Sequence, residues 1–241
     1  TLRRYVHLST GNYHVRTSHV YTDFGLLTCN DAFGADVNEV FLQLTGLGRA
    51  TTLKHLWQAP FTLHTEMLDK IREETAIARK GRRARIVAKM NALLEPGIID
   101  ALYAASQAGV EVDLIVRGVC ALRPGIPGVS DNIRVRSIIG RFLEHTRVFY
   151  FHGDGAEHVY LSSADWMERN FFRRIEVCFP ILDPDAKRRV IGEGLWPYVE
   201  DTLRAWEMDR DGNYRRFGGN DAPQGAQESL IERLAEAAAI A

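Results

Sequence analysis

The sequence lacks a run of apolar residues long enough to span a bilayer, and its start lacks the charged-then-apolar pattern of a secretion signal. We therefore expect no membrane span and a cytoplasmic location. A large excess of charge is also missing, because the formal net charge is −1 and the pI is about 6.7. Domains dedicated to nucleic acids usually carry enough Lys and Arg to raise the pI well above neutral, so no nucleic-acid partner is expected.

Cysteine is scarce as well. The three cysteines are an odd set, and Cys120 and Cys178 lie in apolar runs, whereas Cys29 does not. This is typical of reduced, buried thiols in a cytosolic protein and argues against a disulfide framework. Apolar residues are plentiful, since 46% of the 241 residues are hydrophobic. A chain of this length can form one large core or two modest cores, so a folded protein is predicted.

The order of strand and helix patterns indicates the α/β class. Apolar runs predict strands at 4–8, 22–28, 84–89, 112–116, 133–139, 147–151, 159–161 and 175–181. Helical patterns are found at 36–44, 66–80, 96–108 and 229–240, with further helices from Asp185 onwards, including one between Trp196 and Trp206. The unit formed by 84–89, 96–108 and 112–116 predicts two parallel strands with a right-handed crossover.

Two stretches have the composition of connections between elements. Residues 46–60 mix Gly, Thr and Pro and resemble a linker, which predicts a domain boundary near residue 60. Residues 218–227 have the composition of a flexible loop. The chain also starts without Met and enters the strand at 4–8 almost at once, so we expect it to begin inside a domain.

A short sequence pattern occurs twice, at two places far apart in the chain. Residues 8–13 (LSTGNY) and 161–166 (LSSADW) share the pattern apolar, Ser, hydroxyl, small, Asn or Asp, aromatic. A six-residue match of this kind can arise by chance, but its surroundings strengthen it. Shortly before the second copy, His145 and Arg147 stand two apart at the start of a predicted strand.

The pair His145 and Arg147 predicts a phosphate site. Side chains two apart on a strand share a face, so both can meet one phosphate. Ser163 and Asp165 from the next strand would complete a cradle that orients the imidazole and binds phosphate oxygens. This pattern resembles one half-site of the phospholipase D superfamily, in which two halves face each other. The histidine of the other half would precede residue 1, and neither His7, His14 nor His19 is placed to replace it.

Longer matches make the sequence similar to polyphosphate kinase of the first, bacterial type. The segments that carry the resemblance cover residues 4 to about 235 and are 5–13, 21–28, 59–61, 89–91, 102–106, 116–120, 123–125, 130–133, 141–145 and 162–170. One departure is Ser9, where the family usually has Gly.

The resemblance implies a phospholipase D-like α/β fold with two related mixed sheets flanked by helices, the first truncated at its N-terminus. Residues 1–60 would be the second part of the first phospholipase D-like domain, and 61–241 the second domain. The implied activity is reversible transfer of the terminal phosphate of ATP to polyphosphate through a phosphohistidine upstream of Thr1. Mg²⁺ is the implied cofactor, ATP, ADP and polyphosphate are the implied partners, and a homo-oligomer is expected.

Residue by residue, the resemblance implies that His145 is catalytic and also contacts ATP or phosphate, together with Tyr21, Arg117 and Arg174. Arg117 follows a predicted parallel strand, at the edge where open α/β sheets bind ligands. Lys89 ends another strand and is a weaker phosphate candidate, as are Arg147, Ser163 and Asp165. No metal ligand is assigned.

The segment 117–174 contains nine arginines and no lysine. With six acidic residues, the segment has a net charge of +3, and planar guanidinium groups suit a polyanion channel. A solvated face with surface ion pairs is the simpler interpretation. The nine arginines are Arg117, Arg123, Arg134, Arg136, Arg141, Arg147, Arg169, Arg173 and Arg174.

Two other functions stay open. One is a phosphodiesterase or nuclease of the same superfamily, although Arg147 and Asp165 replace the Lys and Asn expected there. The other is a non-catalytic module that binds polyanions, since half of the site is absent. For the same reason, we expect the chain alone not to turn over.

Overall fold

The computed structural model describes residues 3–46, 53–218 and 224–240. Its strands are β1 (Val6–Ser9), β2 (Tyr21–Thr22), β3 (Gly25–Thr28), β4 (Trp57–Ala59), β5 (Arg85–Met90), β6 (Glu111–Val116), β7 (Ile133–Ile138), β8 (Leu143–Glu144), β9 (Val148–Phe151), β10 (His158–Ser162), β11 (Glu176–Pro180), β12 (Ala205–Met208) and β13 (Tyr214–Arg216). Its helices are α1 (Asp31–Leu44), α2 (Leu63–Arg79), α3 (Pro96–Gln107), α4 (Glu168–Arg173), α5 (Pro184–Gly194), α6 (Trp196–Val199) and α7 (Ala226–Ile240), with a 3-10 turn at Gly153–Gly155.

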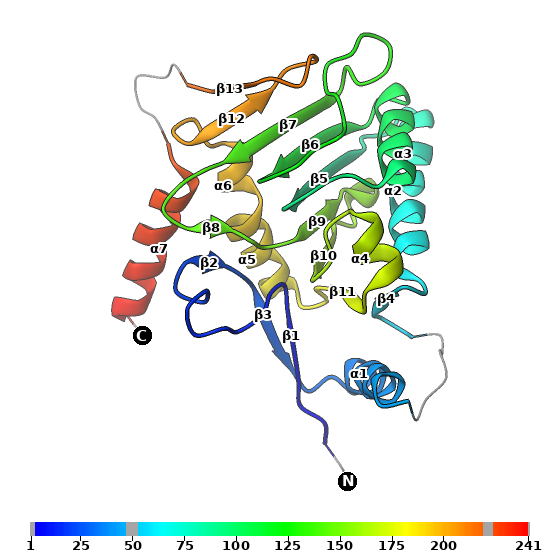
Figure 1. The fold of residues 1–241 in the computed structure, drawn as a ribbon, viewed down its shortest axis with the longest axis vertical. Coiled ribbons are helices and arrows are strands. Elements are labelled where there is room, and N and C mark those ends of the chain that lie inside the picture. Colours follow the sequence, from blue (N-terminus) through cyan, green and yellow to red (C-terminus); the bar gives the residue numbers. More distant parts are fainter. Residues whose placement is uncertain (1–2, 47–52, 219–223, 241) are drawn as a thin grey trace.

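One large mixed sheet organises the described part of the chain (Figure 1). Its nine strands there lie in the order β13-β12-β7-β6-β5-β9-β10-β11-β4. The central strands β5, β6 and β7 are parallel, and every pairing outside them is antiparallel. Two small sheets accompany it, an antiparallel β1-β3 ribbon and a parallel β2-β8 pair.

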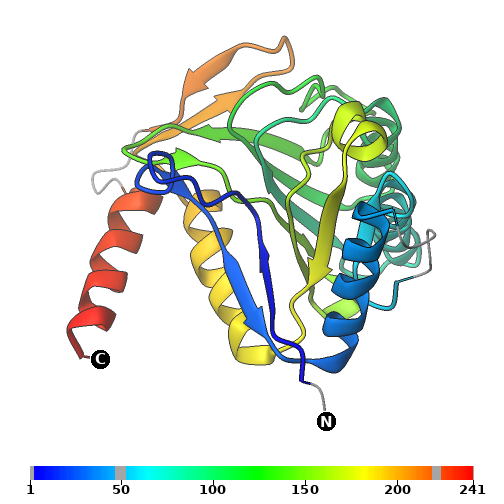
Figure 2. The same cartoon turned by 60° about the horizontal axis from the view of Figure 1, so that its bottom comes forward.

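Both faces of the sheet are covered, which explains the continuous apolar runs of its central strands. Along β5, Ile86, Ala88 and Met90 join one buried cluster with α2 and α3, whereas Val87 joins a second cluster with α5 and α6. The second cluster also takes in the first part of the chain through Leu8 of β1. Figure 2 shows α7, α5, the β1-β3 ribbon and α1 following one another along this side.

The parallel unit predicted from the sequence is confirmed. Strand 84–89, helix 96–108 and strand 112–116 correspond to β5, α3 and β6 within one or two residues. The first expected sheet is represented among the described residues by the β1-β3 ribbon, so the two sheets differ greatly in size.

Two predicted boundaries in the first part were wrong. The helix expected at 36–44 begins at Asp31, because the Asn30 side chain caps it by accepting from the backbone N–H groups of Ala32 and Phe33. The strand expected at 22–28 is divided into β2 and β3, with Asp23 between them. This division frees the Asp23 side chain for the contacts described below.

Other corrections concern the second half. The helix expected between Trp196 and Trp206 spans only α6, and Trp206 lies on β12, which pairs with β7. The strands β8, β12 and β13 and the helix α4 were not predicted. The predicted linker at 46–60 and loop at 218–227 lie partly outside the described residues, at 47–52 and 219–223.

The domain division at residue 60 stays a prediction. The strand β4 pairs with β11 and therefore belongs to the large sheet, so a border before Trp57 would keep that sheet whole. Within the described ranges, no helix is both long and apolar enough to cross a membrane.

The burial of β5 against α2 and α3 can be tested at Ile86, which is 0% exposed. Ile86→Val should lower the free energy of unfolding by about 1 kcal/mol, because it leaves a methyl-sized gap in a packed core. Ile139→Val removes the same group from a side chain that is 62% exposed, and should change the value by less than about 0.5 kcal/mol. Urea denaturation measures both, and equal effects would contradict this packing.

Candidate active site

The topology gathers polar residues at one edge of the large sheet. Parallel β5 and β6 end at this edge, where Asn91 and Arg117 follow them. Antiparallel β9 begins there, so His145 and Arg147 precede its first residue at the same edge. The strand β10 ends beside them and is followed by Asp165. The carboxyl ends of parallel strands are where open α/β sheets bind ligands.

His145 is held by a carboxylate from the first part of the chain. Its Nδ1 lies 3.0 Å from both side-chain oxygens of Asp23. The imidazole is 19% exposed and the carboxylate 18%, so the pair is partly buried but accessible. Because a carboxylate can only accept, Nδ1–H donates to Asp23, and Nε2 is the ring nitrogen that is free of the carboxylate.

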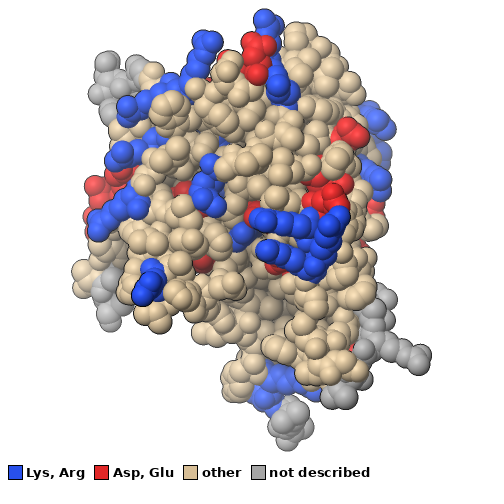
Figure 3. Space-filling model, in the orientation of Figure 1, with Lys and Arg blue, Asp and Glu red and all other residues tan. Residues whose placement is uncertain are grey.

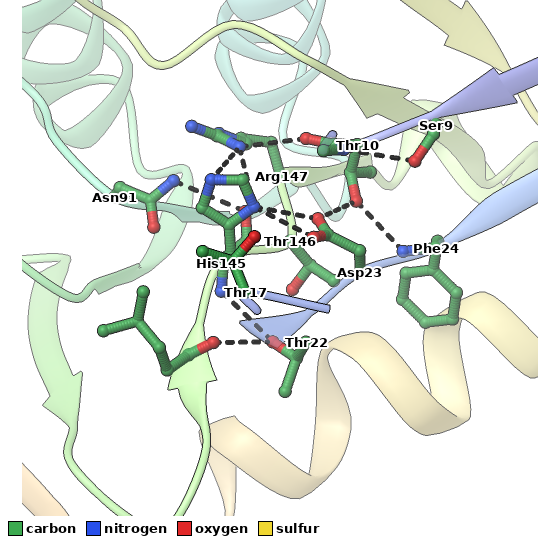
Figure 4. A network of polar contacts seen from close by, with 12 residues as sticks. Ser9, Thr10, Thr17, Thr22, Asp23, Phe24, Asn91, His145, Thr146 and Arg147 are labelled. Carbon is green, nitrogen blue, oxygen red and sulfur yellow. Dashed lines mark hydrogen bonds and ion pairs between the residues drawn. The ribbon is translucent and has the colours of Figure 1, made fainter. Parts of the chain in front are cut away.

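Asp23 is itself fixed by the end of β1. Thr10 donates its hydroxyl to Asp23 Oδ1 at 2.7 Å and accepts from the backbone N–H of Phe24 at 3.0 Å. The Thr10 N–H donates to the Phe24 carbonyl, also at 3.0 Å. Figure 4 shows these contacts converging on the imidazole. The carboxylate is therefore oriented before any ligand binds.

Arg147 lies beside the free nitrogen of His145. Its Nη1 is 3.1 Å from His145 Nε2 and donates to the Thr10 carbonyl at 2.9 Å. The other side of the guanidinium makes a two-point contact with Asp165, at 3.2 and 3.0 Å. Both copies of the internal repeat therefore lie where a strand ends, and both contact the same arginine.

Asn91 joins three of these groups. Its backbone N–H donates to Asp165 at 2.7 Å, its Oδ1 accepts from Arg117 Nε at 2.9 Å, and its Nδ2 donates weakly to the His145 carbonyl at 3.4 Å. Arg117 is thereby brought to the same edge as His145. The Tyr21 ring packs against the imidazole of His145, with ring centroids 4.8 Å apart and the rings tilted by 45°.

Lys89 has a different environment from the one predicted. It is 2% exposed, and its ammonium donates to Glu144 and Thr146, both at 2.6 Å, with the Tyr198 ring centroid 3.6 Å away. Burial lowers the pKa of Lys89, and the Glu144 charge opposes this shift. Burial alone would raise the pKa of Glu144, but the Lys89 charge and hydrogen bonds outweigh it and lower the pKa. An ammonium engaged in this way does not fit the predicted phosphate contact.

Two other predicted residues lie apart from the His145 network. The Ser163 hydroxyl donates to Glu176 at 2.5 Å on the neighbouring strand β11. Arg174 is exposed at the C-terminal end of α4, and within the described ranges it makes no hydrogen bond with His145. Figure 3 shows a large group of basic side chains over the region of α4, which carries Arg169 and Arg173. This group suits the polyanion surface expected from the arginine-rich segment.

The described residues do not fit a resident Mg²⁺ site. In those ranges, no group of three or more His, Cys, Asp or Glu side chains could hold a metal ion. The carboxylates nearest the imidazole are already engaged, Asp23 by His145, Asp165 by Arg147 and Glu144 by Lys89.

The sequence interpretation missed Asp23, Asn91 and Glu144 as site residues. Asp23 and Asn91 stand in segments that carried the resemblance, yet neither has a distinctive spacing to His145. Asn91 directly follows a predicted buried strand, and this position at a strand end was a usable signal. For Asp23, no signal in its own segment indicated the histidine as its partner.

Comparison with known proteins shows the family to which this chain belongs. A family model described as Polyphosphate kinase C-terminal domain 2 matches residues 56–227, and one described as Polyphosphate kinase C-terminal domain 1 matches residues 1–50. The chain belongs to the polyphosphate kinase family. Curated polyphosphate kinases of Burkholderia multivorans and Paraburkholderia phytofirmans are 63% and 60% identical to it over 234 residues.

The chain aligns with only part of the length of its polyphosphate kinase relatives. The two curated matches take in 97% of the chain but 34% of each relative. The crystal structure of polyphosphate kinase from Porphyromonas gingivalis is similar over 99% of this chain and 37% of that one, with 36% identity and a TM-score of 0.94. The α/β class predicted from the sequence is confirmed by the mixed sheet and its flanking helices, and the fold is that of the Porphyromonas gingivalis polyphosphate kinase.

The buried pair of Lys89 and Glu144 can be tested by substitution. Lys89→Met should lower the free energy of unfolding by about 3–5 kcal/mol, because it leaves the Glu144 carboxylate buried without its counter-ion. Combining it with Glu144→Gln should restore most of that loss. Lys80→Met, at an exposed position after α2, should change the value by less than about 0.5 kcal/mol. Equal stability of the two single lysine variants in urea would show that the pair is not the structural element inferred here.

Proposed function

We propose that this chain supplies one half of the active site of a polyphosphate kinase, which reversibly transfers the terminal phosphate of ATP to polyphosphate. The observation that supports it is the alignment of Asp23, His145 and Arg147. A carboxylate orients the imidazole, and a guanidinium lies against its free nitrogen. Such a set can present an oriented proton-transfer group to a phosphate. Asp165 and the Thr10 carbonyl already hold the Arg147 guanidinium, so Arg117 would supply the positive charge for the phosphate.

The reaction has two displacements. First, a histidine nitrogen upstream of Thr1 attacks the terminal phosphorus of ATP, the bond to the bridging oxygen breaks, and ADP leaves. Then a terminal oxygen of polyphosphate attacks the same phosphorus, the nitrogen–phosphorus bond breaks, and polyphosphate gains one unit. Because the first nucleophile lies outside these residues, the chain alone is expected not to turn over.

His145 handles the proton on the opposite face. In the first displacement, a protonated Nε2 can give its proton to the leaving ADP oxygen, and in the second it can take a proton from the attacking polyphosphate end, while Nδ1–H stays on Asp23. The carboxylate offsets the positive charge that the ring acquires, as in other carboxylate–histidine pairs. Arg117, whose Nη atoms extend beyond the Nε contact with Asn91, offers a charged contact for nucleotide phosphates.

Tyr21 and Arg174 complete the proposal. Tyr21 packs against His145 with its ring tilted, and would contact the nucleotide beside it. Arg174 belongs to the exposed basic group at α4 and would contact the polyphosphate chain. A cytoplasmic location, a homo-oligomeric state and Mg²⁺ delivered with ATP remain parts of the proposal.

His145→Gln in the complete gene product should lower ATP-dependent polyphosphate synthesis by about 10²–10⁴-fold, because glutamine cannot transfer the proton. Asp23→Asn should lower it by a similar factor, about 10²–10⁴-fold, because an amide can favour the wrong tautomer of His145. His152→Gln is the matched control, since His152 lies at the opposite end of β5, where its backbone pairs with Arg85. It should keep activity within about twofold.

Wild-type turnover in His145→Gln would contradict the role of this residue. Cleavage of a chromogenic phosphodiester by the unsubstituted protein, without polyphosphate synthesis, would favour the phosphodiesterase instead. Polyphosphate binding without either reaction would favour the non-catalytic module.

A further inference from the structure

Gln227, the second residue of α7, has a buried and fully engaged side-chain amide. It is 3% exposed. Its Oε1 accepts from the backbone N–H of Phe142 at 2.9 Å, and its Nε2 donates to the Phe142 carbonyl at 2.9 Å and to Glu144 Oε1 at 2.5 Å. The amide thus pairs with the backbone of Phe142 much as a strand would, at the entrance to β8.

A glycine permits this close approach. A Cβ atom on residue 140 would lie far inside van der Waals contact with Gln227 Oε1. Gly140 therefore leaves room for the amide, and a larger residue at this position would push the Gln227 amide away from Phe142.

Two further hydrogen bonds connect Gln227 to the catalytic histidine. Glu144 Oε2 accepts from the Thr22 hydroxyl at 3.0 Å, and the same hydroxyl accepts from the backbone N–H of His145 at 3.1 Å. The strands β2 and β8 pair here, with Thr22 opposite Glu144. The hydrogen bonds therefore run from α7 through Glu144 and Thr22 to His145, beside the Asp23 that fixes its ring.

We propose that Gln227 is a positioning residue for His145. By fixing the backbone of Phe142 and the carboxylate of Glu144, it holds the segment before His145 in the register that keeps Nδ1 on Asp23. Its consequence for turnover rests on the proposed function. The helix α7 is thus part of the active-site framework, although none of the contacts above brings it to the reacting atoms.

Gln227→Leu in the complete gene product removes all three hydrogen bonds at nearly constant side-chain volume. It should lower kcat about tenfold, because small displacements of a catalytic group are costly, while KM for ATP stays within about twofold. Ser106→Ala is the control, since the Ser106 hydroxyl is also buried, at 1% exposure, and accepts from the Asn132 N–H beside α3. It should lower the melting temperature without changing kcat.

Gln227→Glu gives a second, pH-dependent readout. The new carboxylate would face that of Glu144 and could not donate to it, so activity should be lost at neutral pH. Protonation of the introduced carboxyl group restores a donor as the pH falls, so kcat relative to the unsubstituted protein should rise toward low pH. If Gln227→Leu does not fold, Gln227→Glu tests the proposal in its place. A ratio of kcat values that does not change with pH would contradict the proposal.

The tautomer of His145 provides a readout that is independent of the reaction. In ¹⁵N-histidine spectra, assigned by comparison with His145→Gln, the unsubstituted protein should show the Nδ1–H form, and Gln227→Leu a mixture of forms. If the unsubstituted protein makes no polyphosphate, the proposed function fails, yet this comparison still decides the role of Gln227. A folded Gln227→Leu protein with unchanged kcat and unchanged His145 signals overturns the proposal.

Discussion

The buried guanidinium of Arg147 is the interaction on which the rest of the site depends. It is 8% exposed, so its charge must be matched, and Asp165 does this with a two-point contact. The same group binds the Thr10 carbonyl and lies against His145. The end of β1, the end of β10 and the imidazole are thereby fixed to one another. A site oriented by a core interaction needs little rearrangement when a ligand arrives.

A helix or strand could be predicted where its own residues carry a helical or strand pattern. The strands β5 and β6 and the helix α3 were found because burial on both faces requires unbroken apolar strands and because α3 has a helical period. The short strands β2 and β8 have two residues each, and only their mutual pairing defines them. The helix expected between Trp196 and Trp206 ends at Val199, and the pairing of β12 with β7, which no local pattern encodes, places Trp206 on a strand.

The candidate site was predictable to the extent that its residues are close in sequence. His145, Arg147 and Asp165 come from neighbouring strands, so their spacing was informative. Asp23 meets His145 across 122 residues, and no local pattern encodes such a contact. Lys89 was named as a weaker phosphate candidate because it lies near a strand end. Strand side chains alternate between faces, and Lys89 points toward Tyr198 and α6, where Glu144 neutralises it.

The pairing of β2 with β8, and of Phe142 with Gln227, also bears on the order of synthesis. Thr22 of β2 and Glu144 of β8 are 122 residues apart, and Phe142 and Gln227 are 85 residues apart. Contacts between such distant residues form more slowly than α3 or the β5-β6 pair. A ribosome that has reached residue 200 has already synthesised β1 to β11, but the glutamine that completes the surroundings of Glu144 does not yet exist. Because Gln227 lies 83 residues after Glu144, the hydrogen bonds around this carboxylate are completed only after α7 has been synthesised.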